Sequence, residues 1–189
     1  LSEMLGEMNV SHTGCYYRAN FPNTDATASL GLLYDYSFTG NGLKVADVIE
    51  GGPAEKASSR IKAGTVIESI DGQKIDDSFD FYQLLNRKAG KITLLSLFVP
   101  ASDRRWEETV QPISGGEEGE LLYKRWVKNR RAEVDRLSGG KIGYIHVRAM
   151  NDASMRAAFD EALGLNLEKD AIIVDTRFNG GGNIHEQLS

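Results

Sequence analysis

Cysteine, histidine and proline are scarce in this sequence, with one, three and four of each among 189 residues. A single cysteine, Cys15, cannot form an intramolecular disulfide, so cysteine usage does not identify a redox compartment. So few cysteines and histidines do not supply a structural zinc site, and we expect neither a metal nor another cofactor.

Long apolar runs are also lacking. The longest, residues 92–99, contains Thr93 and Ser96 and is far shorter than the roughly 20 residues that cross a membrane as a helix. Basic residues do not exceed acidic ones, and the net charge of −5 argues against nucleic acid as the main partner. A basic stretch at 124–131 contains Trp126, but acidic residues follow it, so a solvated helix face is the favoured interpretation.

Glycine is abundant, with 20 residues against an average near 7% of a protein. With only four prolines beside it, this excess does not resemble a flexible linker. Two polar, turn-rich stretches, 21–29 and 114–120, divide the chain into three predicted parts: 1–28, 29–113 and 114–189. Because the chain does not begin with methionine and ends where a helix would be under way, we expect a piece of a longer protein.

The middle part alternates short apolar runs with turn signals, which predicts a small, mostly antiparallel sheet. Asp71-Gly72 is typical of a two-residue hairpin turn, and Gly52-Pro53 indicates a short helix over 54–57. A second helix is predicted over 78–87, with Asp77 as its N-cap. The expected strands are 30–36, 43–49, 65–70, 92–99 and 107–113.

The last part predicts a charged helix over 121–137 and two apolar strands, 142–148 and 171–175. A helix over 153–163 joins these strands, and its length favours a right-handed βαβ unit with parallel strands. His146 falls on the first strand and is interpreted as a hydrogen-bonded histidine that either belongs to the core or supports a residue of a site. The expected fold class is therefore mixed α+β, a small sheet with two helices followed by the start of an α/β unit.

Three glycines at 180–182 follow the second parallel strand, at the edge where sites gather in α/β sheets. A dinucleotide-binding motif would need glycine where His185 stands. An oxyanion hole, in which a backbone N–H stabilises a tetrahedral intermediate, stays open, as does a tight turn without a ligand. His185 begins a zinc-protease-like pattern, but Ser189 occupies the second histidine position, so no metal is expected there.

Ser11-His12-Thr13-Gly14 is a second candidate for chemistry. A histidine between two hydroxyl residues can act as a general base. A surface histidine in a turn that ends a helix is the alternative. Spacing along the chain does not decide between them, because base and nucleophile must meet in space.

Three motifs in this order resemble the tricorn-type peptidases, serine proteases of the same clan as the C-terminal processing peptidases. They are Glu-Met-Asn-Val-Ser-His-Thr-Gly at 7–14, the segments 30–33, 52–54 and 61–64 of the middle part, and Asp-Thr-Arg-Phe-Asn-Gly-Gly-Gly at 175–182. The resemblance covers essentially the whole chain. It implies that His12 is the catalytic base and Ser11 a serine of the catalytic tetrad, and that Gly181 or Gly182 supplies an oxyanion-hole N–H. It also implies that the nucleophilic serine and a tetrad glutamate lie downstream of this chain.

Residues 29–113 resemble a PDZ domain of the permuted bacterial arrangement. In such a domain a peptide pairs with the open edge of the first strand, here 30–36, while a helix walls the other side. Backbone N–H groups of Gly31, Leu32 and Leu33 would meet a terminal carboxylate. The residues expected to bind peptide are Leu30, Gly31, Leu32, Leu33, Phe79 and Tyr82. The alternative is a domain that only spaces the two halves of a protease.

The resulting prediction is a fragment of a tricorn-like serine protease that hydrolyses peptide bonds by acyl transfer, the fragment itself being inactive. The rival from another class is a non-catalytic peptide-binding scaffold with a degenerate protease core. A second rival, a lysine-assisted processing peptidase, would have no role for His12. The expected partners are peptides or unfolded proteins. The sequence is compatible with a homo-oligomer of the full-length protein, and with either a cytoplasmic or an exported location.

Overall fold

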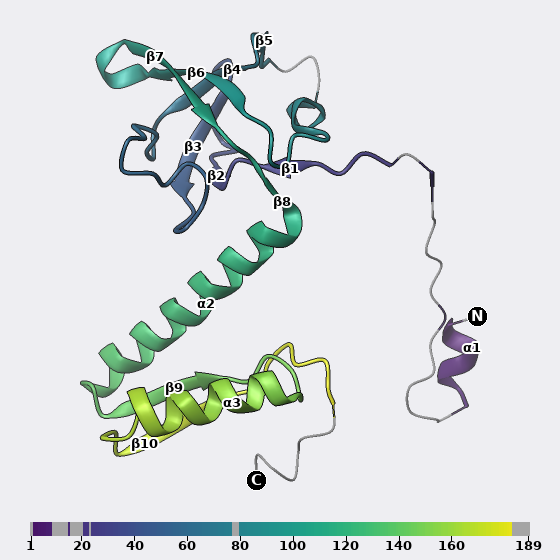
Figure 1. The fold of residues 1–189 in the computed structure, drawn as a ribbon, viewed down its shortest axis with the longest axis vertical. Coiled ribbons are helices and arrows are strands. Elements are labelled where there is room, and N and C mark those ends of the chain that lie inside the picture. Colours follow the sequence, from purple (N-terminus) through teal and green to yellow (C-terminus); the bar gives the residue numbers. More distant parts are fainter. Residues whose placement is uncertain (1, 9–14, 16–20, 23, 77–79, 183–189) are drawn as a thin grey trace.

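The computed structural model describes residues 2–8, 15, 21–22, 24–76 and 80–182. Within them, an antiparallel sheet unit and a βαβ unit lie at the two ends of one long helix, α2 (Gly115–Ser138) (Figure 1). The short helix α1 (Ser2–Gly6) is the first described element of the chain. No helix in the described part of the chain combines the length and the apolar character that crossing a membrane requires.

The sheet unit has the strand order β2-β3-β4-β6-β7, with β5 paired to β4, and every pairing is antiparallel. Asp71 (φ 49°) and Gly72 (φ 80°) form the predicted hairpin turn between β4 and β5. A separate two-stranded ladder joins the segment before β2 to the segment before α2. The strands are β1 (Ala28–Ser29), β2 (Leu32–Tyr34), β3 (Leu43–Val48), β4 (Val66–Ile70), β5 (Gln73–Lys74), β6 (Thr93–Val99), β7 (Arg104–Val110) and β8 (Ile113–Ser114).

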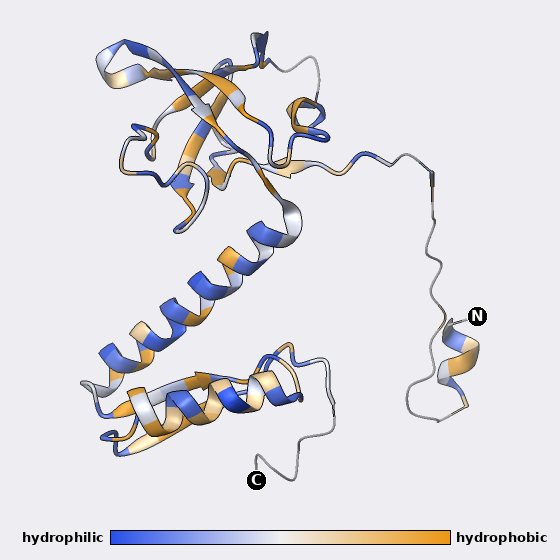
Figure 2. Ribbon diagram, viewed as in Figure 1, coloured by the Kyte–Doolittle hydropathy of each residue, from blue (hydrophilic) through white to orange (hydrophobic). Residues whose placement is uncertain are grey.

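Apolar side chains from the middle of the sheet form the core of this unit. Along β6, buried and partly exposed residues alternate, as expected of a strand with one face on the core. Leu95 and Leu97 are completely buried, and Ile67 of β4 lies in the same cluster. Figure 2 shows this as apolar colour along the central strands, in contrast with the mostly polar α2.

Both helices predicted for the sheet unit need correction. Residues 54–57 do not form a helix, because Gly52 and Pro53 pack against Gly31, and the backbone N–H of Glu55 donates to the carbonyl of Gly52 in a four-residue β-turn. The second helix is a 3-10 helix, η1 (Phe81–Leu85), whose N-cap is Asp80. The predicted N-cap, Asp77, lies outside the described residues. The helix stays short because Asn86, which follows it, pairs with Thr27.

Helix α2 begins six residues earlier than the sequence predicted. Ser114 accepts from the backbone N–H of Glu117, and the Glu117 carboxylate accepts from the backbone of Ser114, which is a capping box. The stretch 114–120, interpreted from its glycines as a boundary, is therefore the cap and first turns of the helix. Two ion pairs, Arg125–Asp47 and Lys128–Glu50, join α2 to the sheet unit.

The βαβ unit has the predicted topology. Its elements are β9 (Ile142–His146), α3 (Asp152–Asp160), a π-helical turn η3 (Glu161–Leu165) and β10 (Ala171–Asp175). The two strands are parallel, with Ala171 opposite Ile142 and Asp175 opposite His146. Strands β9 and β10 therefore end at the same edge of the sheet, beside each other.

Candidate functional site

The glycine loop, defined here as residues 176–182, follows β10 at the carboxyl edge of the parallel strands. Asn179 organises this loop: its side-chain amide donates to the carbonyl of Val147 (2.9 Å), and its Oδ1 accepts from the backbone N–H of Gly181 (2.7 Å). Met150 then donates its N–H to the carbonyl of Gly181 (3.1 Å). The loop is thus attached to the segment that follows β9.

Two of the three glycines have a conformation that other residues rarely adopt. Gly181 has φ 89° and is exposed, with open space where a side chain would begin. Gly182 has φ 144°, and a Cβ there would overlap the carbonyl of Met150. Bare backbone is required at Gly182 for packing. The N–H of Gly181, the predicted oxyanion donor, is engaged by Asn179 in this structure.

A buried carboxylate anchors the start of the loop. Asp175 is 8% exposed and accepts from the Tyr144 hydroxyl (2.6 Å), from the backbone N–H of Arg177 (2.9 Å) and from its guanidinium (2.5 Å). The hydrogen bonds from Arg177 hold the pKa of Asp175 well below its usual range. Burial, and next the bond to Asp175, raise the pKa of Tyr144 to about 12, so its hydroxyl remains a donor at neutral pH.

His146 joins the same loop to α2. Its Nε2 lies 2.9 Å from the carbonyl oxygen of Arg177, which can only accept, so Nε2 carries the proton. Its Nδ1 then accepts from the Tyr123 hydroxyl of α2 at 2.9 Å. Trp126 packs edge-on against the His146 ring and contacts Phe178 of the loop. His146 is therefore the hydrogen-bonded histidine that the sequence predicted.

Three predicted site residues, His12, Ser11 and Phe79, lie outside the described residues, and so does His185. Among the described residues, no group of three or more His, Cys, Asp or Glu side chains could hold a metal ion.

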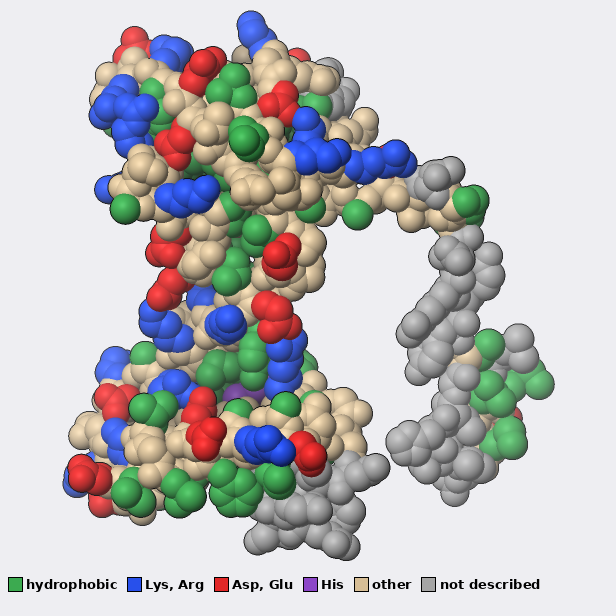
Figure 3. Space-filling view, in the orientation of Figure 1, with side chains coloured by type: hydrophobic (Ala, Val, Ile, Leu, Met, Phe, Trp, Pro, Cys, Tyr) green, Lys and Arg blue, Asp and Glu red, His purple; other side chains and the backbone are tan. Residues whose placement is uncertain are grey.

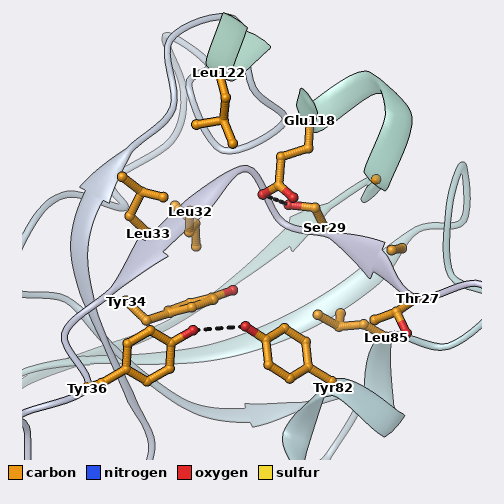
Figure 4. Close-up of a pocket in the computed structure, with 12 residues that line it drawn as sticks. Thr27, Ser29, Leu32, Leu33, Tyr34, Tyr36, Tyr82, Leu85, Glu118 and Leu122 are labelled. Atoms are coloured by element: carbon orange, nitrogen blue, oxygen red, sulfur yellow. Dashed lines mark hydrogen bonds between the residues drawn. The ribbon is translucent and has the colours of Figure 1, made fainter. Parts of the chain in front are cut away.

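A groove of about 470 Å³ lies at the sheet end of α2, along the free edge of β2. The backbone groups of residues 31, 33 and 35 face β3. The N–H of Ile49 donates to the carbonyl of Gly31, and the backbone N–H of Asp35 donates to the backbone carbonyl of Lys44. Between them, Leu33 is paired with Asp47. The backbone groups of Leu32 and Tyr34 consequently face the groove. Figure 4 shows Tyr36 and Tyr82 meeting across one end of it, their hydroxyls 2.9 Å apart.

The predicted groove residues separate into two groups. Leu32, Leu33 and Tyr82 line the groove, but Leu30 is 1% exposed and belongs to the core. The three consecutive N–H groups predicted for a terminal carboxylate are not presented together. Gly31 donates to Ser29 Oγ (2.9 Å), and the backbone of Leu33 faces β3.

Several residues of both sites were missed by the sequence analysis. Glu118 and Leu122 reach the groove from the first turns of α2, in or beside the stretch interpreted as a boundary. The signal that would have placed them is the capping box, Ser114 followed by Glu117. Tyr144 and Asp175 meet only because their strands pair, and no sequence pattern indicated that contact.

The chain is similar in sequence to known peptidases. Residues 141–189 match the model of peptidase family S41. The chain is 34% identical over 131 residues to a putative tricorn protease homolog 2 of Streptomyces coelicolor, an alignment that covers 69% of this chain and 11% of that protein. It is 29% identical to the tricorn protease of Thermoplasma acidophilum over 98% of this chain and 18% of that protein.

A solved structure has the same fold. The crystal structure of the tricorn protease matches with a TM-score of 0.71 at 24% identity, covering 86% of this chain and 16% of that one. This chain therefore spans less than a fifth of the length of each of these three proteins.

Proposed function

The chain is related to the tricorn-type serine peptidases, and from that relationship we propose that it forms part of an enzyme that hydrolyses peptide bonds by acyl transfer. The observation that carries the proposal is the glycine loop, which stands at the carboxyl edge of β9 and β10 inside the region that matches peptidase family S41. Peptides or unfolded proteins are the proposed substrates.

In the proposed mechanism, His12 takes the proton from a serine hydroxyl as its oxygen attacks the carbonyl carbon of the substrate, and later gives that proton to the leaving amine. Ser11 belongs to the same catalytic group. A backbone N–H of Gly181 or Gly182 stabilises the oxyanion of the tetrahedral intermediate. For Gly181 this requires its N–H to exchange the Asn179 side chain for the substrate oxygen. Water then hydrolyses the acyl-enzyme.

The nucleophilic serine and a tetrad glutamate are proposed to lie outside these 189 residues, so the isolated chain should be inactive. The test is hydrolysis of fluorogenic peptides by the longer protein that contains this chain. His12→Ala should lower kcat by about 10³-fold or more. Ser11→Ala should also lower kcat, whereas the control Ser58→Ala, at an exposed serine of the sheet unit, should leave kcat unchanged. Activity of residues 1–189 above their own His12→Ala variant would contradict the proposal.

We propose further that residues 29–113 form a PDZ domain whose groove binds an extended peptide. The free edge of β2, with the backbone groups of Leu32 and Tyr34 directed into a partly apolar groove, supports strand addition. Titration of the chain with labelled extended peptides tests this. Absence of binding at millimolar concentration would favour the alternative, a domain that only spaces the other parts.

The non-catalytic scaffold remains the second candidate, because the free β2 edge could serve binding alone. The residues that follow Ser189 in the longer protein discriminate the two. A serine in a small-residue turn, with a glutamate after it, supports the peptidase, and its absence supports the scaffold.

A further inference from the structure

The groove along β2 has walls from four elements, one of which is β1 with Ser29. The β2 edge forms one wall, η1 supplies Tyr82 and Leu85, and the first turns of α2 supply Glu118 and Leu122 (Figure 4). Most of the lining is aliphatic or aromatic. The remaining polar groups are hydroxyls and the Glu118 carboxylate.

Glu118 is the one ionisable acid or base, apart from tyrosine hydroxyls, among the described residues that line the groove. No lysine, arginine or histidine in the described part of the chain lines it. The carboxylate accepts from Ser29 Oγ at 2.5 Å and is only partly exposed. The groove therefore has a fixed negative charge at one end with no cation of its own among these lining residues to neutralise it.

The tyrosines of the groove respond to that charge. Burial is the main cause that raises the pKa of Tyr34, and the charge of Glu118 contributes. The bond to Tyr36 and burial raise the pKa of Tyr82 to about 12, again with a contribution from Glu118. Both hydroxyls therefore stay protonated at neutral pH.

Ser29 links the Glu118 carboxylate to the backbone just before β2. Its Oγ accepts from the N–H of Gly31 (2.9 Å) and donates to Glu118 (2.5 Å). The N–H that would cradle a terminal carboxylate thus ends on a hydrogen-bond chain whose last member is already a carboxylate. The nearby N-terminus of α2 offers no compensation, because its capping box uses Ser114 and the first turn carries Glu117 as well as Glu118.

We propose that Glu118 makes this groove selective for extended peptides that place a lysine or arginine side chain at its Ser29 end, and against peptides that place a carboxylate there. The proposal rests on the proposed peptide-binding function of the groove. Two opposite charges in a partly desolvated groove attract more strongly than they would in bulk water, and two like charges repel more strongly. The backbone of β2 supplies affinity, and Glu118 supplies the choice of side chain.

The probe is an acetylated, amidated heptapeptide of threonine and valine with one central lysine. Its binding to the full chain is measured by fluorescence anisotropy. Three matched peptides replace the lysine with norleucine, replace it with glutamate, or keep norleucine and end in a free carboxylate. We expect the lysine peptide to bind about tenfold more tightly than the glutamate peptide, with norleucine between them. Added salt should reduce the preference.

Glu118→Gln should abolish the difference between lysine and glutamate peptides, while thermal unfolding shows that the variant is folded. Glu120→Gln is the matched control, because Glu120 lies on the same helix but pairs with Arg148 outside the groove. It should keep the preference. Glu118→Lys should reverse it.

The outcomes separate the two proposals. Equal binding of the lysine and glutamate peptides, or a preference for the free carboxylate, would refute selection by Glu118 and leave the peptide groove standing. Failure of all four peptides to bind at millimolar concentration would refute both proposals.

Discussion

Asp175→Asn would remove the charge that anchors the glycine loop while it preserves the size of the side chain. The carboxylate accepts from three donors: the Tyr144 hydroxyl, the Arg177 backbone and the Arg177 guanidinium. Asparagine keeps one oxygen, which can serve the backbone N–H of Arg177. The amide nitrogen of asparagine is itself a donor and would face the Arg177 guanidinium and the Tyr144 hydroxyl, so both groups lose the acceptor oxygen to which they donate in the wild type.

The size of the effect follows from these bonds. A hydrogen bond to a charged group contributes about 1.5–3 kcal/mol net, and Tyr144 is almost fully buried. The Arg177 side chain is 59% exposed, so water replaces much of its interaction. We therefore expect the free energy of unfolding of the βαβ unit to fall by about 2 kcal/mol.

Trp126 makes this measurable, because it contacts His146 and Phe178 next to the loop. The chain has one other tryptophan, Trp106, which lies in the sheet unit, so a Trp106→Phe background makes the fluorescence specific. Urea unfolding of Asp175→Asn is compared with Asp160→Asn, an exposed position at the end of α3 that should change stability by less than about 0.5 kcal/mol. A loss for Asp175→Asn as small as this control would refute the anchoring role.

The pH dependence gives a second check with a definite sign. The pKa of Asp175 is lowered from its usual 3.8 when the protein folds, because Arg177 and Tyr144 donate to the carboxylate. The folded state then binds fewer protons than the unfolded state. The contribution to stability is complete above about pH 5 and is lost as the pH falls through the folded pKa. The gap between wild type and Asp175→Asn should therefore narrow below pH 4 and remain constant from pH 5 to 8.

Two further changes test other parts of the fold. Ser114→Ala removes the cap of α2 and should lower the unfolding free energy by about 1 kcal/mol in a circular dichroism melt. Ser58→Ala, at an exposed serine of the sheet unit, should change it by less than about 0.5 kcal/mol, and equal losses in the two variants would deny the capping box its role. The double variant Ile173→Lys, Val174→Lys should reduce self-association of the chain, measured by sedimentation velocity. Both side chains are exposed apolar residues of β10, at 44% and 58%. Unchanged sedimentation would show that this strand does not mediate association.

That second change concerns a broader apolar surface. Figure 3 shows hydrophobic side chains gathered along the outer edge of the βαβ unit, whereas acidic and basic side chains mix over α2. The exposed apolar residues of this unit are Phe159, Leu163, Leu165, Leu167, Ile172, Ile173, Val174 and Phe178. Parallel strands are normally covered on both faces, so β10 presents a surface that favours contact.

Local patterns predicted most strands, because alternation and turn residues act over a few positions. The Asp71-Gly72 hairpin, the parallel β9 and β10 and the helix between them all follow from such signals. The helix at 54–57 was wrong because burial of Pro53 and Ala54 against the sheet overrides the preference of proline for a first helical turn.

The sites depended on contacts that are distant in sequence. Glu118 meets Ser29 across 89 positions, and Asp175 meets Tyr144 across 31. The glycine-rich start of α2 resembled a linker because glycine disfavours helices, and only the Ser114–Glu117 cap reverses that reading. The role predicted for His12 stays a prediction.

Helix α2 brings the groove and the glycine loop within two turns of each other. Leu122 lines the groove, Tyr123 holds His146, and Trp126 contacts Phe178 of the loop. Four residues of helix span about 6 Å, over which a helix behaves as a stiff rod. A ligand in the groove that shifted this part of α2 would also shift the residues that support the loop. If that ligand changed the affinity of the loop for a second ligand by some factor, the second ligand would change the affinity of the groove by the same factor.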